Sequence, residues 1–247
     1  MAIKTTLNYS PNFNPNKRNP KQIKYIIFHY TGMKKESAAI ERLTKIQSEV
    51  SSHYLVRNNG EILTLVPDLY IAWHAGISSW KNDNSLNKNS IGIEISNPGH
   101  QFNYKRFSEK QIKSLLNLSK LLIKKYKISS QNILGHSDIA PDRKKDPGEK
   151  FPWNYLAKKK VGQWHNVKSE ILKHNRNHKV KKADQINFIK NLFKIGYSKK
   201  KPKYLIKEKY RSFMTAAFQR RYRPELVNSK IDKECLIISQ NLAKKRY

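Results

Sequence analysis

The chain has 247 residues, and 50 basic residues against 18 acidic ones give it a net charge of +32 at pH 7. Its apolar residues (38%) suffice for a hydrophobic core and exclude wholesale disorder, and no apolar run reaches the ~20 residues of a membrane-spanning helix. The single cysteine, Cys235, excludes an internal disulfide and a CxxC metal site, and we expect a buried thiol in a helix.

The first elements along the chain are a strand and a helix. Residues 1–22 form a polar lead-in, rich in Pro and Asn and without periodicity. The apolar and aromatic run Tyr25–Tyr30 predicts a buried strand that ends near His29. Residues 37–49 carry apolar side chains at helical spacing, and Ser37 is the expected N-cap.

A hairpin, a second buried strand and a long helix follow. Asn58-Asn59-Gly60 contains the strongest short hairpin signal and predicts a hairpin over residues 53–66. Residues 91–95 alternate strictly between isoleucine and other residues, which predicts a strand. Residues 108–126 predict a helix that Ser108 caps.

These strands and helices predict an α/β domain over residues 23–157. Residues 158–182 are basic and poorly periodic, and we interpret them as a linker. Residues 183–247 predict a small module of three amphipathic helices. Their signals are Asp184 as the cap and Gly196 as the end of the first helix, Pro224 after the second, and Asp232 as the cap of the third.

The positive charge is concentrated in the C-terminal part. Residues 1–157 contain 24 basic and 12 acidic residues (net +12), whereas residues 158–247 contain 26 and 6 (net +20). Such a charge favours a polyanionic partner: nucleic acid, an anionic membrane surface or the carboxylate-rich peptides of a bacterial cell wall. Lys outnumbers Arg by 39 to 11, which also fits a drift of the composition towards AT-rich codons. Phosphate and base recognition prefer Arg, so the excess of Lys favours this alternative explanation of the charge.

Three residues are of the types that commonly bind a catalytic metal ion. His29 ends the first strand, His136 follows a short apolar run, and Asp146 comes ten residues later. Two imidazoles and one carboxylate commonly hold a catalytic zinc ion and leave one position for water. The spacing is not that of one helix, so it also fits a core histidine at 29 and a turn histidine at 136.

Six short segments of the first 157 residues form an ordered set of motifs. They are His29-Tyr30-Thr31, Ser51–Val56, Ala72–Gly76, Asn89–Glu94, Gly135–Pro141 and Arg143–Gly148. Together they resemble the zinc-dependent N-acetylmuramoyl-L-alanine amidases of the type-2 class, which are related to peptidoglycan recognition proteins and phage amidase lysozymes. Residues 216–232 resemble the three-helix peptidoglycan-binding module of the AmiD-type envelope members of this family.

The resemblance implies a fold and a metal site. The fold is a central mixed β-sheet flanked by helices, followed by a small C-terminal three-helix module. One zinc ion is implied at His29, His136 and Asp146. Asp138 and Asp142 are rival carboxylates in the same loop, but the family places its ligand immediately before Pro-Gly, which favours Asp146 and leaves the other two turn-forming or solvated.

Two charged residues are candidates for catalysis. In the alternating strand, Glu94 lies with Gly92 on the face opposite to the isoleucines, which suits a pocket wall. Lys144 lies two residues before Asp146, so an extended segment points both side chains the same way and points Lys145 away. The resemblance implies that Glu94 is the general base and that Lys144 lies near the metal.

The segment that follows Ala72 predicts a loop that lines the substrate cleft. Three residues are expected to bind substrate: Trp73, His74 and Arg143. For His53 we expect a structural role or a contact that orients a metal ligand. His174 and His178 have helical spacing but no carboxylate nearby in the sequence, and we expect them to be solvated.

The resemblance implies an enzyme of cell wall degradation that hydrolyses the amide bond between N-acetylmuramic acid and the L-alanine of the peptidoglycan stem peptide by a zinc-activated water. Two alternatives are a non-catalytic peptidoglycan recognition protein and, from charge alone, a nucleic-acid-binding protein. The first 20 residues show no secretory signal, which fits the cytoplasm, whereas the C-terminal module favours the cell envelope or export, and we expect the latter. We also expect that module to hold peptidoglycan, and we expect removal of residues 177–247 to leave hydrolysis of a soluble muropeptide nearly unchanged.

Overall fold

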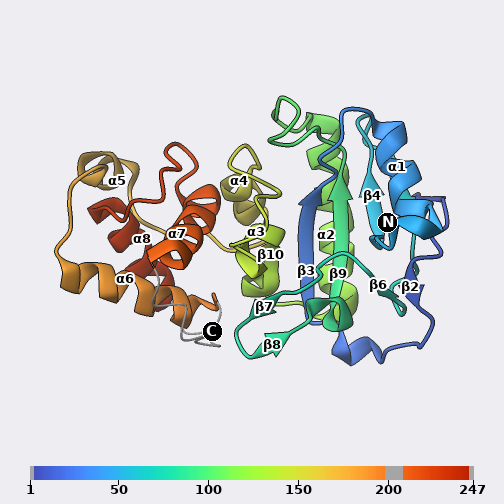
Figure 1. Ribbon diagram of the computed structural model, residues 1–247, viewed down its shortest axis with the longest axis horizontal. Helices are drawn as coiled ribbons and strands as arrows, with labels where there is room; N and C mark the ends of the chain where they lie inside the picture. The colour runs from blue at the N-terminus through green and yellow to red at the C-terminus, as the bar shows by residue number, and fades with distance from the viewer. Residues whose placement is uncertain (1–2, 198–207, 245–247) are drawn as a thin grey trace.

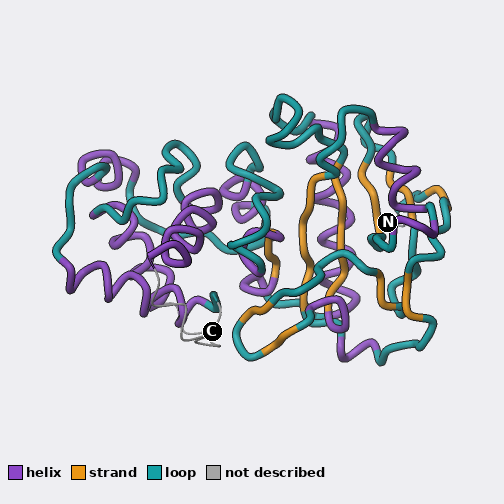
Figure 2. Tube along the Cα trace, viewed as in Figure 1, coloured by secondary structure: helices purple, strands orange, loops and turns teal. Residues whose placement is uncertain are grey.

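The computed structural model describes residues 3–197 and 208–244. Figure 1 shows two adjoining parts, a β-sheet with helices against it on the right and a group of helices on the left. The strands gather in the first part, and the second part is helical (Figure 2). This arrangement confirms the predicted α/β class and the C-terminal helices.

The central sheet has six strands in the order β1-β5-β4-β9-β3-β10. Strands β4 and β5 pair antiparallel, whereas the other neighbours pair parallel, so the sheet is mixed as the resemblance implies. The strands are β1 (Thr6–Leu7), β3 (Tyr25–Tyr30), β4 (Tyr54–Val56), β5 (Ile62–Thr64), β9 (Ser90–Ile95) and β10 (Ile133–Gly135). Two further antiparallel pairs join β2 (Phe13–Asn14) with β6 (Ile71–Ala72) and β7 (Ser79–Trp80) with β8 (Asp83–Asn84).

Helix α2 (Glu109–Tyr126) covers one face of the sheet (Figure 1). The backbone N–H of Gln111 donates to the Ser108 side chain, and the Ser108 N–H donates to the Gln111 side chain, which forms a capping box. One hydrophobic cluster joins the helix to alternate strand residues, namely Leu115, Leu118 and Leu122 with Ile26, Phe28, Ile91, Ile93 and Ile95. The predicted helix and its cap are confirmed.

The opposite face of the sheet carries the polar residues. Strand alternation puts these residues on it: Tyr25, Ile27 and His29 of β3, and Ser90, Gly92 and Glu94 of β9. The first helix, α1 (Glu36–Thr44), packs here against the β4–β5 hairpin through Leu43, Leu55 and Leu63. The hairpin predicted around Asn58-Asn59-Gly60 is confirmed.

The helix predicted over residues 37–49 is shorter than the sequence indicates. Lys35 is its N-cap residue and Ser37 lies inside α1, so the predicted cap is wrong. The backbone turns extended at Lys45, and a 3₁₀ turn follows. Ile46 continues the apolar spacing but is 62% exposed. The apolar spacing in the sequence therefore extends beyond the last residue of the helix.

The helical part consists mainly of α5 (Ser169–Asn175), α6 (Lys182–Ile195), α7 (Glu208–Tyr222) and α8 (Lys233–Lys244). Helix α6 begins after Lys181, with Asp184 in its first turn rather than at its cap, and Gly196 ends it as predicted. Helix α8 begins after Asp232, whose side chain accepts a hydrogen bond from the backbone N–H of Cys235. Cys235 is fully buried in α8, as expected.

The segment 158–182, interpreted from its charge as a linker, contains helix α5. Leu172 of this helix is buried in the same hydrophobic cluster as Phe188 and Leu192 of α6. The segment therefore contains a packed helix and is not only a connection. The domain boundaries themselves stay a prediction.

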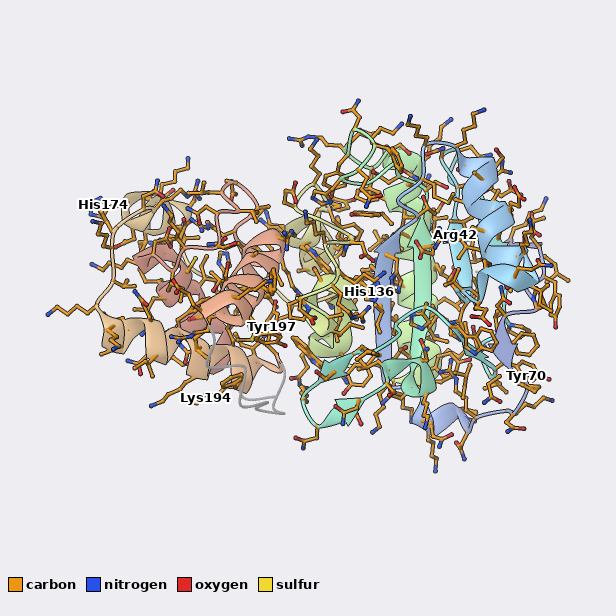
Figure 3. The ribbon with its side chains drawn as sticks, viewed as in Figure 1. Arg42, Tyr70, His136, His174, Lys194 and Tyr197 are labelled. Atoms are coloured by element: carbon orange, nitrogen blue, oxygen red, sulfur yellow. The ribbon has the colours of Figure 1, made fainter. Side chains whose placement is uncertain are left out.

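The two parts share one hydrophobic cluster. It contains Ile27 and Trp80 of the first part together with Tyr197 and Phe218 of the second. The rings of Trp80 and Tyr197 meet edge to face with centroids 4.9 Å apart. A Cβ atom on Gly196 would lie 2.5 Å from the Trp80 ring, so glycine both ends α6 and admits this ring. Figure 3 shows Tyr197 at the junction of the two parts.

Shorter elements complete the chain: α3 (His136–Ile139), α4 (Trp153–Lys158), η1 (Pro20–Gln22), η2 (Ile46–Ser48), η3 (Leu86–Asn89) and η4 (Ser130–Asn132). In the two ranges that the structure describes, no helix combines the length and the apolar composition needed to cross a membrane.

Candidate metal centre and catalytic cleft

The two candidate histidine ligands meet because β10 pairs with β3. In this parallel pair Gly135 lies opposite Phe28, so the next residues, His136 and His29, emerge side by side at the ends of their strands. The loop after α3 then returns to this point, where the backbone carbonyl of Asp146 accepts a hydrogen bond from the N–H of Ser137. Topology thus brings together side chains that are far apart in the sequence.

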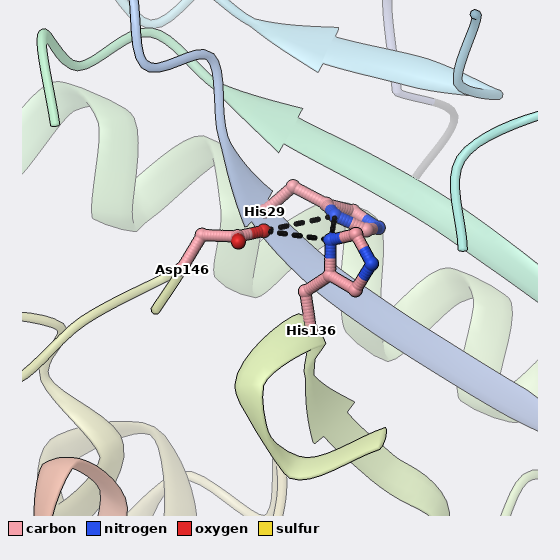
Figure 4. Close-up of side chains that lie close together, drawn as sticks. All are labelled: His29, His136 and Asp146. Carbon is pink, nitrogen blue, oxygen red and sulfur yellow. Dashed lines mark hydrogen bonds and ion pairs between the residues drawn. The ribbon is translucent and has the colours of Figure 1, made fainter. Parts of the chain in front are cut away.

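Three donor atoms converge at this point (Figure 4). The Nδ1 atoms of His29 and His136 lie 2.9 Å apart, and Oδ2 of Asp146 lies 3.1 and 3.0 Å from them. All three side chains are buried. Two imidazole nitrogens and one carboxylate oxygen are the donor set of many catalytic metal sites.

The charges at this cluster favour a bound cation. Burial, followed by the influence of His136, lowers the pKa of His29 to about 4, so its ring is neutral at pH 7. Although burial acts to raise it, the pKa of Asp146 lies well below its usual range, so its carboxylate is ionised at pH 7. The Nε2 atom of His136 donates to the carbonyl oxygen of Ala75 at 3.1 Å, which leaves a neutral His136 with an unprotonated Nδ1. An ionised carboxylate facing unprotonated nitrogens in a buried site is stabilised by a metal ion, so the residues present fit one.

Glu94 forms part of a cavity of about 480 Å³ whose wall includes the three candidate ligands. It lies opposite His29 in the pairing of β9 with β3. Its Oε2 atom is buried and has no hydrogen-bond partner within residues 3–197 and 208–244. Burial and the charge of Asp146 raise the pKa of Glu94 to about 8, against an opposite effect of Lys144. A carboxylate with a raised pKa and a free oxygen can exchange a proton with a group in the cavity.

Lys144 is half-buried and lines the same cavity. Its charge acts to lower the pKa of both Glu94 and His29, which places its ammonium group within electrostatic reach of the site. Lys145 is exposed, but it also borders the cavity, so the predicted contrast with Lys144 is only partial. Arg143 is exposed at the same wall and donates to the carbonyl of Ile77.

The segment after Ala72 lines the cavity as expected, but its two candidate residues differ. Trp73 is 37% exposed and lines the cavity. His74 is buried, and both of its ring nitrogens have partners inside the protein, His29 and Ser90. The substrate hydrogen bond expected of His74 therefore has no free nitrogen to form it.

The cavity also contains residues that the sequence analysis did not single out. Tyr30, the neighbour of His29, has its hydroxyl 2.9 Å from Nδ1 of His100, and Nε2 of His100 lies 3.0 Å from Glu149. Arg42, on α1, also lines the cavity. Tyr30 could have been found from its place in the first motif, whereas His100 and Arg42 carry no local signal.

The rival carboxylates do not take part in the metal cluster. Asp142 is exposed. Asp138 is buried, where it accepts hydrogen bonds from the hydroxyl of Tyr197 and the guanidinium of Arg221. Asp138 is turn-forming as expected, because it also accepts a hydrogen bond from the backbone N–H of Gly135 at the start of α3. The alternative expectation of a solvated side chain is wrong, because Tyr197 and Arg221 bury it.

The remaining candidate histidines lie as expected. His53 is fully buried, and its Nδ1 atom accepts a hydrogen bond from the backbone N–H of Gly92, which fixes the course of β9. His174 and His178 are exposed, with ring centroids 5.5 Å apart. Figure 3 shows His174 at the far end of the helical part, away from His136.

A site with three protein ligands, an open cavity and an adjacent carboxylate defines a metal-dependent hydrolase. The sequence matches the family model of N-acetylmuramoyl-L-alanine amidases over residues 19–149, and the chain belongs to this family. It is 37% identical to the N-acetylmuramoyl-L-alanine amidase AmiD of Escherichia coli, over 91% of this chain and 83% of that protein. It is 32% identical to the 1,6-anhydro-N-acetylmuramyl-L-alanine amidase AmpD of Haemophilus influenzae, over 60% of this chain and 88% of that protein.

Two solved structures cover nearly the whole fold. One is a complex of AmiD from E. coli with anhydro-N-acetylmuramic acid-L-Ala-D-γ-Glu-L-Lys, with a TM-score of 0.79, 36% identity and coverage of 90% of this chain and 88% of that one. The other is AmpDh3 from Pseudomonas aeruginosa with an anhydromuramic pentapeptide, with a TM-score of 0.77, 28% identity and coverage of 92% of both chains. The similarity includes the C-terminal helices, since it extends well beyond the residues of the family match.

Proposed function

We propose that the chain binds one zinc ion at His29, His136 and Asp146 and uses it to hydrolyse the amide bond between N-acetylmuramic acid and the L-alanine of the peptidoglycan stem peptide. The observation that carries this proposal is the convergence of three buried donor atoms, none more than 3.1 Å from the others. Family membership supports the substrate and the reaction. Zinc is favoured because imidazole nitrogen and carboxylate oxygen are its usual ligands and three of them leave a position open.

Zinc supplies a Lewis acid for the scissile carbonyl and lowers the pKa of a water molecule towards ~7. We propose that Glu94 accepts a proton from the attacking water and then delivers this proton to the departing amine of L-alanine. Its free, buried Oε2 atom on the cavity wall supports this role. A positioned general base typically contributes ~10²–10⁴-fold to the rate.

We assign to Lys144 the stabilisation of the negative charge that develops on the carbonyl oxygen during attack. Lys144 lines the same cavity as Glu94 and the candidate ligands. A single donor to a developing oxyanion typically contributes roughly 3–4 kcal/mol to catalysis. Because the ligand set, Glu94 and Lys144 are all present, the non-catalytic alternative has no support from the site.

The charge of the cavity fits a substrate that carries carboxylates. Arg42, Arg143, Lys144 and Lys145 line its wall. A stem peptide contains D-Glu and other residues with free carboxylates, and opposite charges of this kind steer and orient a ligand. Trp73 offers an exposed ring on which an apolar face of a sugar can stack. The two solved relatives that hold anhydromuramyl peptides support muropeptides as the substrate class.

We further propose that the protein works in the cell envelope or outside the cell, where peptidoglycan lies. The similarity to AmiD supports this location. The net charge of +20 on residues 158–247 supports adhesion of the helical part to a polymer rich in carboxylates.

Mass spectrometry of the products tests the proposal. The zinc-loaded protein is incubated with intact sacculi and, separately, with a soluble anhydromuropeptide, and the Glu94→Gln variant serves as the control. We expect stem peptides with a free L-alanine amine from at least one substrate, and the ratio between the two substrates shows which is preferred. Absence of such peptides from both, with zinc bound, would contradict the proposed function.

A further inference from the structure

Strand β9 presents three alternate residues on the face that carries the metal site, and the proposed chemistry uses only the last of them, Glu94. The other two, Ser90 and Gly92, both contact His74. A Cβ atom on Gly92 would lie 2.4 Å from Cγ of His74, so only glycine leaves room for the imidazole ring. The Oγ atom of Ser90 lies 3.1 Å from Nε2 of His74. The strand therefore holds His74 against the sheet in one orientation.

The hydroxyl of Ser90 determines where His74 carries its proton. Its Oγ atom lies 2.5 Å from the carbonyl oxygen of Leu86, which can only accept a hydrogen bond. Because a hydroxyl has a single proton, Ser90 donates to Leu86 and can only accept from His74. A neutral His74 therefore has its proton on Nε2, and its Nδ1 atom is an acceptor.

The proton position of His74 in turn determines the proton position of the candidate metal ligand His29. Nε2 of His29 lies 3.0 Å from Nδ1 of His74, so His29 donates its N–H to that acceptor. A neutral His29 then has no proton on Nδ1. The electron pair of Nδ1 faces Asp146 and His136, where a metal ion would lie.

We propose that Ser90 and His74 are positioning residues, which hold His29 in the one tautomer that can bind the metal. The inference rests on the metal site proposed above, but it concerns the hydrogen-bond chain from Leu86 to His29 and not the reaction. Partners of this kind behind a metal-binding histidine typically change metal affinity by ~10–100-fold.

Without the Ser90 hydroxyl the chain of hydrogen bonds can run in the opposite direction. His74 can then carry its proton on Nδ1 and donate to Nε2 of His29. That arrangement puts the proton of His29 on Nδ1, where it blocks metal binding. Ser90 thus selects between two arrangements of the same rings without touching the metal, the substrate or a ligand.

Nuclear magnetic resonance of the metal-free, ¹⁵N-histidine-labelled wild-type protein tests the inference directly. Long-range ¹H–¹⁵N correlations report which ring nitrogen carries the proton. We expect His29 and His74 both to be protonated on Nε2. A proton on Nδ1 of His29 in the wild-type protein would overturn the inference, and this measurement requires no substitution that could disturb folding.

Zinc affinity, measured by competition with a chromophoric chelator, provides the second test. We expect Ser90→Ala and His74→Leu to bind zinc about 10- to 100-fold more weakly than the wild type. His74→Asn keeps an acceptor near the Nδ1 position and should recover most of that loss. Ser119→Ala removes another fully buried serine hydroxyl, on α2, and should leave the affinity unchanged.

Wild-type zinc affinity in Ser90→Ala would overturn the inference. If the wild-type protein itself bound no zinc, the proposed metal would be wrong, and the tautomers of His29 and His74 would still decide whether the hydrogen-bond chain runs as stated.

Discussion

Arg221 on α7 forms a buried ion pair with Asp138, which lies two residues after the candidate ligand His136. The guanidinium of Arg221 also donates to the carbonyl of Ile133, in the strand that leads to this ligand. Asp138 in turn accepts a hydrogen bond from the hydroxyl of Tyr197, which follows the C-cap of α6. The short helix α3, which begins with His136, is therefore held in place by the C-terminal helices.

Removal of the Arg221 charge should destabilise the whole protein. Arg221→Met leaves the carboxylate of Asp138 buried and unpaired, which typically costs about 3–5 kcal/mol. Urea denaturation measures the free energy of unfolding. The double variant with Asp138→Asn should recover part of the loss. Lys45→Met, which removes an exposed ion pair with Glu41, is the control and should cost less than about 1 kcal/mol. Equal effects of Arg221→Met and Lys45→Met would contradict this account.

The sequence predicts the elements whose signals are local. The apolar run of β3, the Asn-Gly turn of the hairpin and the Ser108 cap each act within a few residues, and all three are present. The end of α1 is not predicted, because the apolar spacing continues to Ile46 while the side chain itself is exposed. Hydrophobic spacing locates a helix better than it locates the end of that helix.

The sequence indicates the residue types of the metal site but not their geometry. His29, His136 and Asp146 meet only because β10 lies beside β3, and spacing alone does not specify this pairing. The resemblance to known motifs, and not the spacing, indicated that these three residues form one metal site. Neither source indicated that His74 contacts Ser90 and His29, because these two partners lie on different strands.

Loss of a ligand should remove the metal without unfolding the protein. We expect His29→Ala and Asp146→Ala to lose zinc and amidase activity, because each removes one of three ligands from a catalytic rather than a structural site. Metal analysis and circular dichroism on the same samples check both parts. Full activity of a metal-free preparation in the presence of a chelator would show that the site is not a zinc centre.

Glu94→Gln should separate metal binding from turnover. The amide retains the shape of the side chain but cannot accept a proton, so we expect bound zinc and a loss of at least about two orders of magnitude in kcat. Steady-state kinetics on a soluble muropeptide measures this loss. Turnover close to that of the wild type would mean that another group is the base.

Lys144→Met should lower kcat more than it changes KM. The ammonium group is proposed to act on charge that develops during the reaction, so its loss affects the transition state and should cost ~10²–10³-fold. Lys145→Met is the control at the neighbouring position. Because Lys145 also borders the cavity, we expect a change in KM there rather than in kcat. A large fall in kcat for both variants would favour a general effect of positive charge.

Truncation of the helical part should affect the catalytic part as well. The sequence suggested that a protein without residues 177–247 would still hydrolyse a soluble muropeptide. The structure places Trp80 and Ile139 in one hydrophobic cluster with these helices, and Arg221 supports the helix that begins with His136. We therefore expect the truncated protein to have a lower Tm and to lose zinc affinity and soluble activity together, measured by thermal denaturation, chelator competition and kinetics.

Charge variants separate adhesion from this structural role. Lys182, Lys190 and Lys194 are exposed on α6, and Figure 3 shows Lys194 pointing outward. Their simultaneous replacement by Gln leaves the shared cluster intact, so soluble activity and Tm should stay unchanged. Co-sedimentation with sacculi should weaken, as it should for the wild type in added salt, because exposed charges are screened within ~8 Å at physiological ionic strength. Undiminished binding of this triple variant to sacculi would assign adhesion to another surface. Unchanged soluble activity after the truncation would mean that the helical part is an independent binding module.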